Sequence, residues 1–120
     1  MVVTKRFQNL PVATAFGRDF PVASTRRARL LGLSHLDPDE AGSGLLIPDC
    51  RSVHTFGMRF ALDLAFLGSD GRVCAVRRGV PPRRLAWDRR ASTVLELPAN
   101  SGILSGLGTG QGGEFLSRLP

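Results

Sequence analysis

Residues 58–66 read Met-Arg-Phe-Ala-Leu-Asp-Leu-Ala-Phe, in which large apolar side chains alternate with small or charged ones. A period of two is typical of a β-strand, so the large side chains at the even-numbered positions should face the core. The turn sequence Gly-Ser-Asp-Gly follows at residues 68–71, and residues 72–76 then return as a second strand. We therefore predict a β-hairpin over residues 58–76, with a polar face formed by the odd-numbered positions of its first strand.

The segments around this hairpin also read as short elements. Two apolar runs, each stopped by a proline, predict strands at residues 44–47 and 93–97. Residues 11–23 predict another hairpin, with a three-residue turn at residues 17–19. Ser24 or Thr25 can cap a helix that continues to Leu33, with Leu30 and Leu33 on its buried face. The sequence thus predicts a mainly β fold on the border of α+β. We expect a compact β-sandwich or barrel-like sheet with one short helix near residues 25–33.

Length and composition predict one domain over residues 1–120, because 120 residues with 42% hydrophobic content can form a single core. No apolar run approaches the roughly 20 residues that a membrane span needs. The first ten residues lack the basic-then-apolar order of a signal peptide. We therefore expect a cytoplasmic protein in which Cys50 and Cys74 are reduced and unpaired. The oligomeric state is not indicated by the sequence.

The net charge of +6 comes from fifteen arginines and one lysine against ten acids, and it predicts attraction to anions. Residues 77–90 hold six of the arginines, the only tryptophan, Trp87, and a single acid, Asp88. Arginines beside an aromatic ring are typical of single-strand nucleic-acid binding, but such surfaces usually present several aromatic rings. We therefore interpret residues 77–92, which also contain the pair Pro81-Pro82, as a long irregular loop with a solvated, basic surface. A nucleic-acid accessory role for residues 77–90 is kept as an alternative.

Residues 50–54 contain a thiol and an imidazole, at Cys50 and His54. They are weak candidates for a nucleophile and its base, because catalytic Cys/His partners usually come from distant segments. The same two residues, with Cys74 and His35, lack the paired spacing of structural zinc sites. We therefore predict no metal site and no cofactor.

Three charged residues lie in predicted strands: Arg59, Asp63 and Glu96. An unpaired charge that is half-buried is costly, so we expect these three side chains to form one hydrogen-bonded network. Three interpretations are open: an ion pair between strands that only completes the fold, a hydrolase pair of carboxylates, or part of a ligand pocket. The predicted ligand-binding residues are His54, Thr55, Arg59, Asp63, Glu96 and Arg51.

Several motifs carry a resemblance to a known family. They are Arg-Leu-Leu-Gly-Leu at residues 29–33, Cys-Arg-Ser-Val-His-Thr-Phe-Gly-Met-Arg-Phe at residues 50–60 and Val-Leu-Glu-Leu-Pro-Ala at residues 94–99. Over roughly residues 20–110 the chain resembles the DUF192 family of uncharacterised prokaryotic proteins. The resemblance implies a compact β-rich domain and no established activity. The chain departs from the family pattern at Ala61, where proline is common in the family, and at residues 109–111, where a Gly-Asp pair is common.

The sequence therefore favours a binding protein over an enzyme. We predict non-catalytic binding of a small polar or anionic ligand, such as a saccharide or a carboxylate, and no membrane partner. The first alternative is a hydrolase that uses Cys50 and His54, or Asp63 and Glu96. The second is the nucleic-acid accessory protein that would use residues 77–90.

Overall fold

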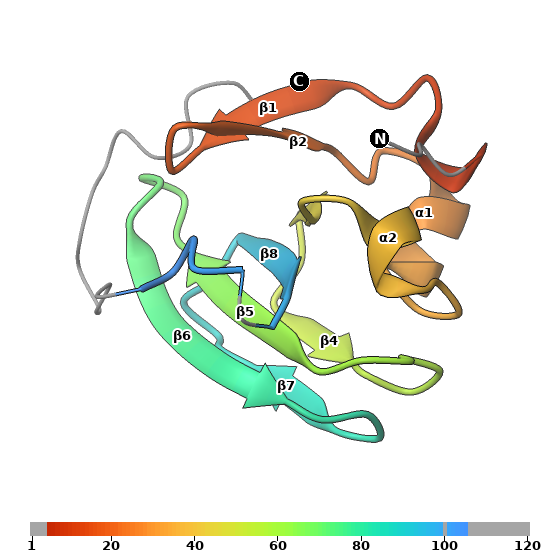
Figure 1. Cartoon of the computed structure of the whole chain (residues 1–120). Coiled ribbons are helices and arrows are strands. Elements are labelled where there is room, and N and C mark those ends of the chain that lie inside the picture. Colours follow the sequence, from red (N-terminus) through yellow and green to blue (C-terminus); the bar gives the residue numbers. More distant parts are fainter. Residues whose placement is uncertain (1–4, 100, 106–120) are drawn as a thin grey trace.

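A four-stranded antiparallel sheet forms the centre of the computed structural model, which describes residues 5–99 and 101–105 (Figure 1). The strand order is β3-β8-β5-β6. The bounds are β3 Leu45–Pro48, β5 Leu62–Leu67, β6 Val73–Val80 and β8 Thr93–Pro98. Because β8 lies between β3 and β5, Glu96 is placed opposite Leu45 on one side and Leu64 on the other.

Two smaller antiparallel sheets and short helices complete the described part of the chain. Strand β1 (Val12–Ala15) pairs with β2 (Arg18–Pro21), and β4 (Ser52–His54) pairs with β7 (Leu85–Trp87). The helices are a 3-10 turn η1 (Lys5–Phe7), α1 (Arg26–Leu31) and α2 (Pro38–Ala41). The described residues thus contain eight strands in three sheets and no closed barrel, which confirms the mainly β prediction with its short helix. Helix α2 lies in a segment without a predicted element.

Apolar side chains cover both faces of the central sheet. The even-numbered residues Leu62, Leu64 and Phe66 are fully buried in one cluster, which Met58 joins and Phe60 packs against. This confirms that the even-numbered positions face the core. The odd-numbered residues Ala65 and Leu67 belong to a second cluster, with Phe20 of the β1–β2 hairpin. The predicted polar face is therefore apolar at Ala65, because that hairpin, which crosses one side of the sheet in Figure 1, packs against Ala65 and Leu67.

The two hairpins differ from their predictions in detail. Ala15 pairs with Arg18, so the first turn has two residues, Phe16 and Gly17, with φ of 54° and 74°. Two successive positive φ values match the twist of a tight hairpin, and the predicted three-residue turn was wrong. Residues 77–92 are not an irregular loop either. Strand β6 continues to Val80, and β7 forms because it pairs with β4, a distant partner that local composition does not reveal.

Helix α1 is short and well capped. The Thr25 hydroxyl accepts a hydrogen bond from the Ala28 amide at 3.1 Å, as an N-cap does. Ala28 is the buried residue of the helix and Leu33 is buried just after it, whereas Leu30 is 65% exposed. The prediction that Leu30 faces the core was therefore wrong, because only one narrow side of this six-residue helix touches the protein.

No helix in the described residues is both long enough and apolar enough to span a membrane. The cytoplasmic location stays a prediction. The departure from the family pattern at residues 109–111 lies outside the described residues.

Candidate functional site

Glu96 is a buried carboxyl group without a cation beside it. Its side chain lies on the same face of the sheet as Leu64, and the residue is 3% exposed. Its Oε1 accepts a hydrogen bond from the Leu33 amide at 3.2 Å. None of the ion pairs among the described residues includes Glu96. Burial raises the pKa of Glu96 to about 7, against the lowering effect of the Leu33 amide. Near neutral pH both the acid and the carboxylate are therefore populated.

Gly32 makes room for this carboxyl group. A Cβ atom at position 32 would lie 2.5 Å from Glu96 Oε1, so the carboxyl group would have to move to make room for it. Its φ of 52° also favours glycine. Arg6 fixes this bend, because its Nη1 donates to the carbonyls of Gly32 and Ser34, each at 2.8 Å. The end of α1 and the N-terminal segment together therefore hold the Leu33 amide against Glu96.

A cavity of about 220 Å³ lies over Glu96, between the end of α1 and the strands β3 and β4. Its polar lining residues are Arg29, Cys50, Ser52, His54 and Glu96, and its apolar ones include Leu31, Ile47 and Val53. Of the polar ones, Glu96 is the most buried. A mostly apolar wall with a few converging polar groups is typical of small-molecule sites.

Arg29 braces the edge of this cavity. Its guanidinium donates to the carbonyl of Pro48 and to that of Asp49, the latter at 3.0 Å. These bonds tie α1 to the segment between β3 and β4, the two strands that form the opposite wall. Hydrogen bonds from Arg29 therefore connect the elements on the two sides of the cavity.

Cys50 and His54 line this same cavity. The Cys50 thiol donates to the Ser52 carbonyl at 3.0 Å, and the exposed His54 ring lies 5.9 Å from that of Phe56, centroid to centroid. Burial raises the pKa of the Cys50 thiol, and it outweighs the lowering effects of the Ser52 carbonyl contact and of Arg29. A raised pKa disfavours the thiolate that a nucleophile needs, so the geometry does not favour a Cys/His pair.

Arg59, Asp63 and Glu96 do not form the predicted network. Arg59 pairs at the surface with Asp37 at 3.0 Å, and both side chains are more than half exposed. Asp63 accepts a hydrogen bond from the Gly79 amide at 2.8 Å. In the sheet Asp63 is opposite Leu97, one residue from Glu96, so the two acids lie on opposite faces. The network prediction was wrong for this reason, and two acids on opposite faces cannot flank one substrate as a hydrolase pair.

The other predicted site residues lie outside the cavity lining. Thr55 is fully buried: its hydroxyl donates to the Pro81 carbonyl at 2.7 Å and accepts from the Arg84 amide at 2.8 Å. It thereby holds the connection between β6 and β7. Arg51 is exposed, and its carbonyl accepts from the Asp88 amide at 3.0 Å.

Of the six predicted ligand-binding residues, the structure brings only His54 and Glu96 to one cavity. Cys50, the weak catalytic candidate, joins them. Across the described residues, no group of three or more His, Cys, Asp or Glu side chains is placed to hold a metal ion.

The model of the DUF192 family, described as "Uncharacterized ACR", matches residues 12–115. The chain belongs to the DUF192 family. A crystal structure of a protein of unknown function from Novosphingobium aromaticivorans DSM 12444 has the same fold, with a TM-score of 0.65 and 22% identity; the match covers 91% of this chain and 88% of that one.

A second crystal structure, of a "putative transcription regulator" from Sinorhizobium meliloti 1021, is also similar to this DUF192 chain. The TM-score is 0.60 at 27% identity, and the match covers 82% of this chain and 85% of that one. No curated protein matches the chain.

Sequence reasoning missed Arg29, Gly32 and Ser52 in the lining of the cavity, and Leu33, whose amide donates to Glu96. The available signal was Gly32, because a glycine near the end of a predicted helix is typical of a cap. What brings Gly32 and Leu33 to Glu96 is a contact across more than sixty positions of the chain. That contact depends on the completed sheet and leaves no local pattern.

Both thiols of this DUF192 chain are unpaired in the structure, as predicted. Burial is the main cause that raises the pKa of Cys50 and of Cys74, so both should alkylate slowly in the folded protein at neutral pH. After unfolding without reductant, intact-mass measurement should show two iodoacetamide adducts. A mass lower by two hydrogens, with no adduct, would mean a disulfide and would contradict the structure.

Proposed function

We propose that this DUF192 protein binds a small polar ligand, without catalysis, in the cavity over Glu96. The observation that carries the proposal is the Glu96 carboxyl group, which is 3% exposed, lines the cavity and has its hydrogen bond from Leu33 at one oxygen. A buried carboxyl group is costly unless it is hydrogen-bonded, and the cavity gives a ligand access to this one. A ligand in the cavity would add hydrogen bonds to the one from Leu33.

A neutral, hydroxylated compound fits this cavity best. With a pKa of about 7, Glu96 can donate a hydrogen bond as the acid or accept one as the carboxylate. A hydroxyl group of the ligand can accept the first of these bonds or donate the second. Ile47 and Val53 would contact the C–H face of the compound. A volume of about 220 Å³ suits one sugar ring rather than a long chain. A carboxylate ligand fits only while Glu96 is protonated, because two carboxylates repel each other.

The hydrolase alternatives receive less support. The Cys50 thiol has a raised pKa, and Asp63 lies on the opposite face of the sheet from Glu96. The description of the Sinorhizobium meliloti protein suggests binding to duplex DNA, which helix-based regulators achieve by placing a helix in the major groove. Helices α1 and α2 have six and four residues, too short for that role.

A thermal-shift screen tests the proposal. Glucose, mannose, maltose, acetate and citrate are each added at millimolar concentration at about pH 5.5 and about pH 8. A ligand at a hundredfold excess over its Kd should stabilise the protein by about 2.7 kcal/mol, a rise in Tm on the order of 10 °C. We expect sugars to stabilise at both pH values and carboxylates only at the lower one.

Two matched variants locate the binding. Leu30→Trp places a bulky ring at the cavity, whose lining includes Leu30. Val12→Trp makes a similar change at an exposed position on β1, away from the cavity. The ligand-induced rise in Tm should be lost in Leu30→Trp and kept in Val12→Trp. A rise that survives Leu30→Trp, or no rise with any compound, would refute binding in this cavity.

A further inference from the structure

The structure shows a second concave surface along β6 and β7, which we call the arginine groove. Its volume is about 580 Å³, and its lining includes Arg77, Arg78, Arg84, Leu85 and Trp87. These residues come from β6, from β7 and from the connection between them. The groove is therefore built from two strands and their connection rather than from the irregular loop that the sequence suggested.

The positive charge of the molecule is concentrated around this groove. Residues 77–90 contain six arginines and one acid, a formal charge of +5 within a chain whose net charge is +6. Both Arg77 and Arg84 are exposed, and their guanidinium groups donate to the carbonyls of Val76 and Arg83, at 3.4 and 3.3 Å. A guanidinium has five N–H donors, so each of these two keeps donors for an anionic ligand.

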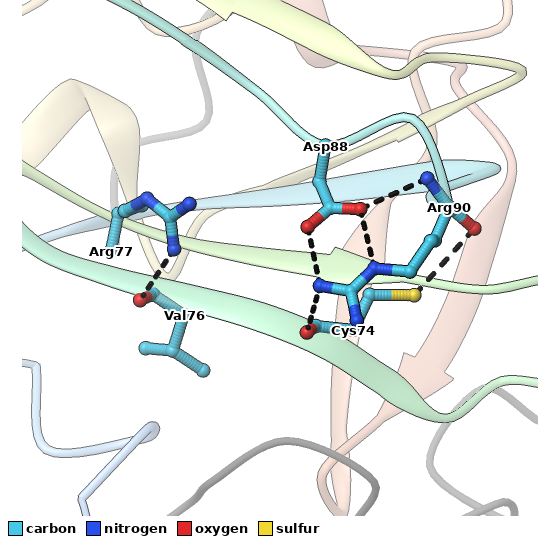
Figure 2. A network of polar contacts seen from close by, with 5 residues as sticks. All are labelled: Cys74, Val76, Arg77, Asp88 and Arg90. Carbon is cyan, nitrogen blue, oxygen red and sulfur yellow. Dashed lines mark hydrogen bonds and ion pairs between the residues drawn. The ribbon is translucent and has the colours of Figure 1, made fainter.

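The single acid of the segment does not neutralise the groove, because Arg90 holds it (Figure 2). The Arg90 guanidinium pairs with Asp88 at 2.7 Å and also donates to the Cys74 carbonyl at 3.0 Å. The hydrogen bonds from the Arg90 side chain are the main reason that the pKa of Asp88 is lowered to about 2, so Asp88 stays ionised and bound to Arg90. Arg90 is not a lining residue of the groove, whereas Arg77 and Arg84 are.

Trp87 adds an aromatic surface to this cationic site. It is the only tryptophan of the chain and is 65% exposed, as is Leu85 two residues earlier on β7. An exposed indole ring on a paired strand is held in place by the backbone and presents a flat face to solvent. Exposed large apolar residues that gather in a concave site mark binding surfaces.

From this combination we propose that the arginine groove binds single-stranded nucleic acid, with the Trp87 ring stacked on a base and Arg77, Arg78 and Arg84 on the neighbouring phosphates. A duplex hides its base faces, so the aromatic surface favours an unpaired strand. The charges of the three arginines provide the phosphate contacts that dominate affinity for nucleic acids, and Arg78 also donates to the Leu104 carbonyl at 2.6 Å. One ring stacks one base, so the groove accounts for a short contact without sequence preference.

The fluorescence of Trp87 tests this inference, because no other tryptophan contributes to the signal. The protein is titrated with a short oligo(dT), a short oligo(U), a hairpin duplex and inorganic polyphosphate at low salt. We expect both single strands to quench the fluorescence, and the duplex and polyphosphate to do so weakly. With three phosphate contacts the logarithm of the binding constant should fall against that of salt with a slope of about −2.

Substitutions distinguish binding in the arginine groove from general attraction between the basic protein and an anionic strand. The double variant Arg77→Gln/Arg84→Gln should reduce the salt slope by about 1.4, at about 0.7 for each phosphate contact. The control Arg18→Gln/Arg27→Gln removes the same charge from exposed positions on β2 and α1, and it should keep the slope. Trp87→Leu, followed by anisotropy of a labelled strand, should weaken binding roughly five- to hundredfold. Unchanged melting points would show that all variants fold.

Three results would overturn the inference. They are a lack of quenching by either single strand, equal binding of polyphosphate and single strands, and equal loss of affinity in the two double variants. None of these results bears on the cavity over Glu96, because the ligands and the substituted residues are different. Tighter binding of oligo(U) than of oligo(dT) would identify RNA as the ligand, and the reverse would identify DNA.

Discussion

Replacing Leu62 with alanine should lower the free energy of unfolding by about 2–5 kcal/mol. Leu62 is fully buried in the first core cluster, at the point where β5 pairs with both β6 and β8. Removing most of its side chain leaves a cavity between three strands whose backbones are fixed by their pairing, so the surrounding side chains can collapse only in part. Urea unfolding followed by circular dichroism measures the loss.

Leu30→Ala is the matched control for this prediction. It removes the same atoms from a leucine that is 65% exposed on α1, and such surface changes usually alter stability by no more than about 0.5 kcal/mol. A loss below about 1 kcal/mol for Leu62→Ala, or similar losses for the two variants, would contradict the core assignment.

Glu96→Gln should change how stability depends on pH. The pKa of Glu96 is about 7 in the folded protein and about 4.5 in an exposed chain, so between these values the folded state holds the extra proton. Stability from this group is therefore fully present below about pH 4.5 and is lost as pH rises to about 7. The total loss is roughly 3 kcal/mol, since one unit of pKa corresponds to about 1.4 kcal/mol.

Glutamine keeps an oxygen for the Leu33 amide but does not ionise. The difference in stability between Glu96→Gln and the wild-type protein should therefore shift in favour of the variant by roughly 3 kcal/mol between about pH 4.5 and about pH 8. Urea unfolding across this range measures it, and taking the difference removes the effects of pH that the two proteins share. Asp39→Asn, an exposed change on α2, should show no such shift. A constant difference for Glu96→Gln would mean that Glu96 is not buried as an acid.

The sequence was most informative where one pattern decided the structure. The alternation from Met58 to Phe66 correctly predicts which residues face the core, because the period of a strand is a local property. The same alternation does not show that Ala65, on the other face, is buried in a second cluster. The β1–β2 hairpin packs against that part of the face, and it lies more than forty residues earlier in the chain. A local pattern cannot show which distant segment packs over it.

The candidate site was predicted less well for a related reason. Glu96 and His54 were named from their polarity among apolar neighbours, and both line the cavity. Arg59 was assigned to the same site but reaches Asp37 in another loop instead. Similarly, Pro81 and Pro82 suggested that residues 77–92 form no regular structure, although they occupy only the short connection between β6 and β7. The sequence did not show which distant residues contact each other in the fold.

The strand order β3-β8-β5-β6 has a consequence for synthesis of the chain. The central position between β3 and β5 belongs to β8, the last strand along the described residues. While a ribosome is still translating residues 68–92, the facing edges of β3 and β5 have no partner, and unpaired strand edges favour association between chains. The nascent protein cannot close its sheet until residue 98 has left the exit tunnel. Protection of those two edges by a chaperone would therefore matter most before that moment, and least once β8 has inserted.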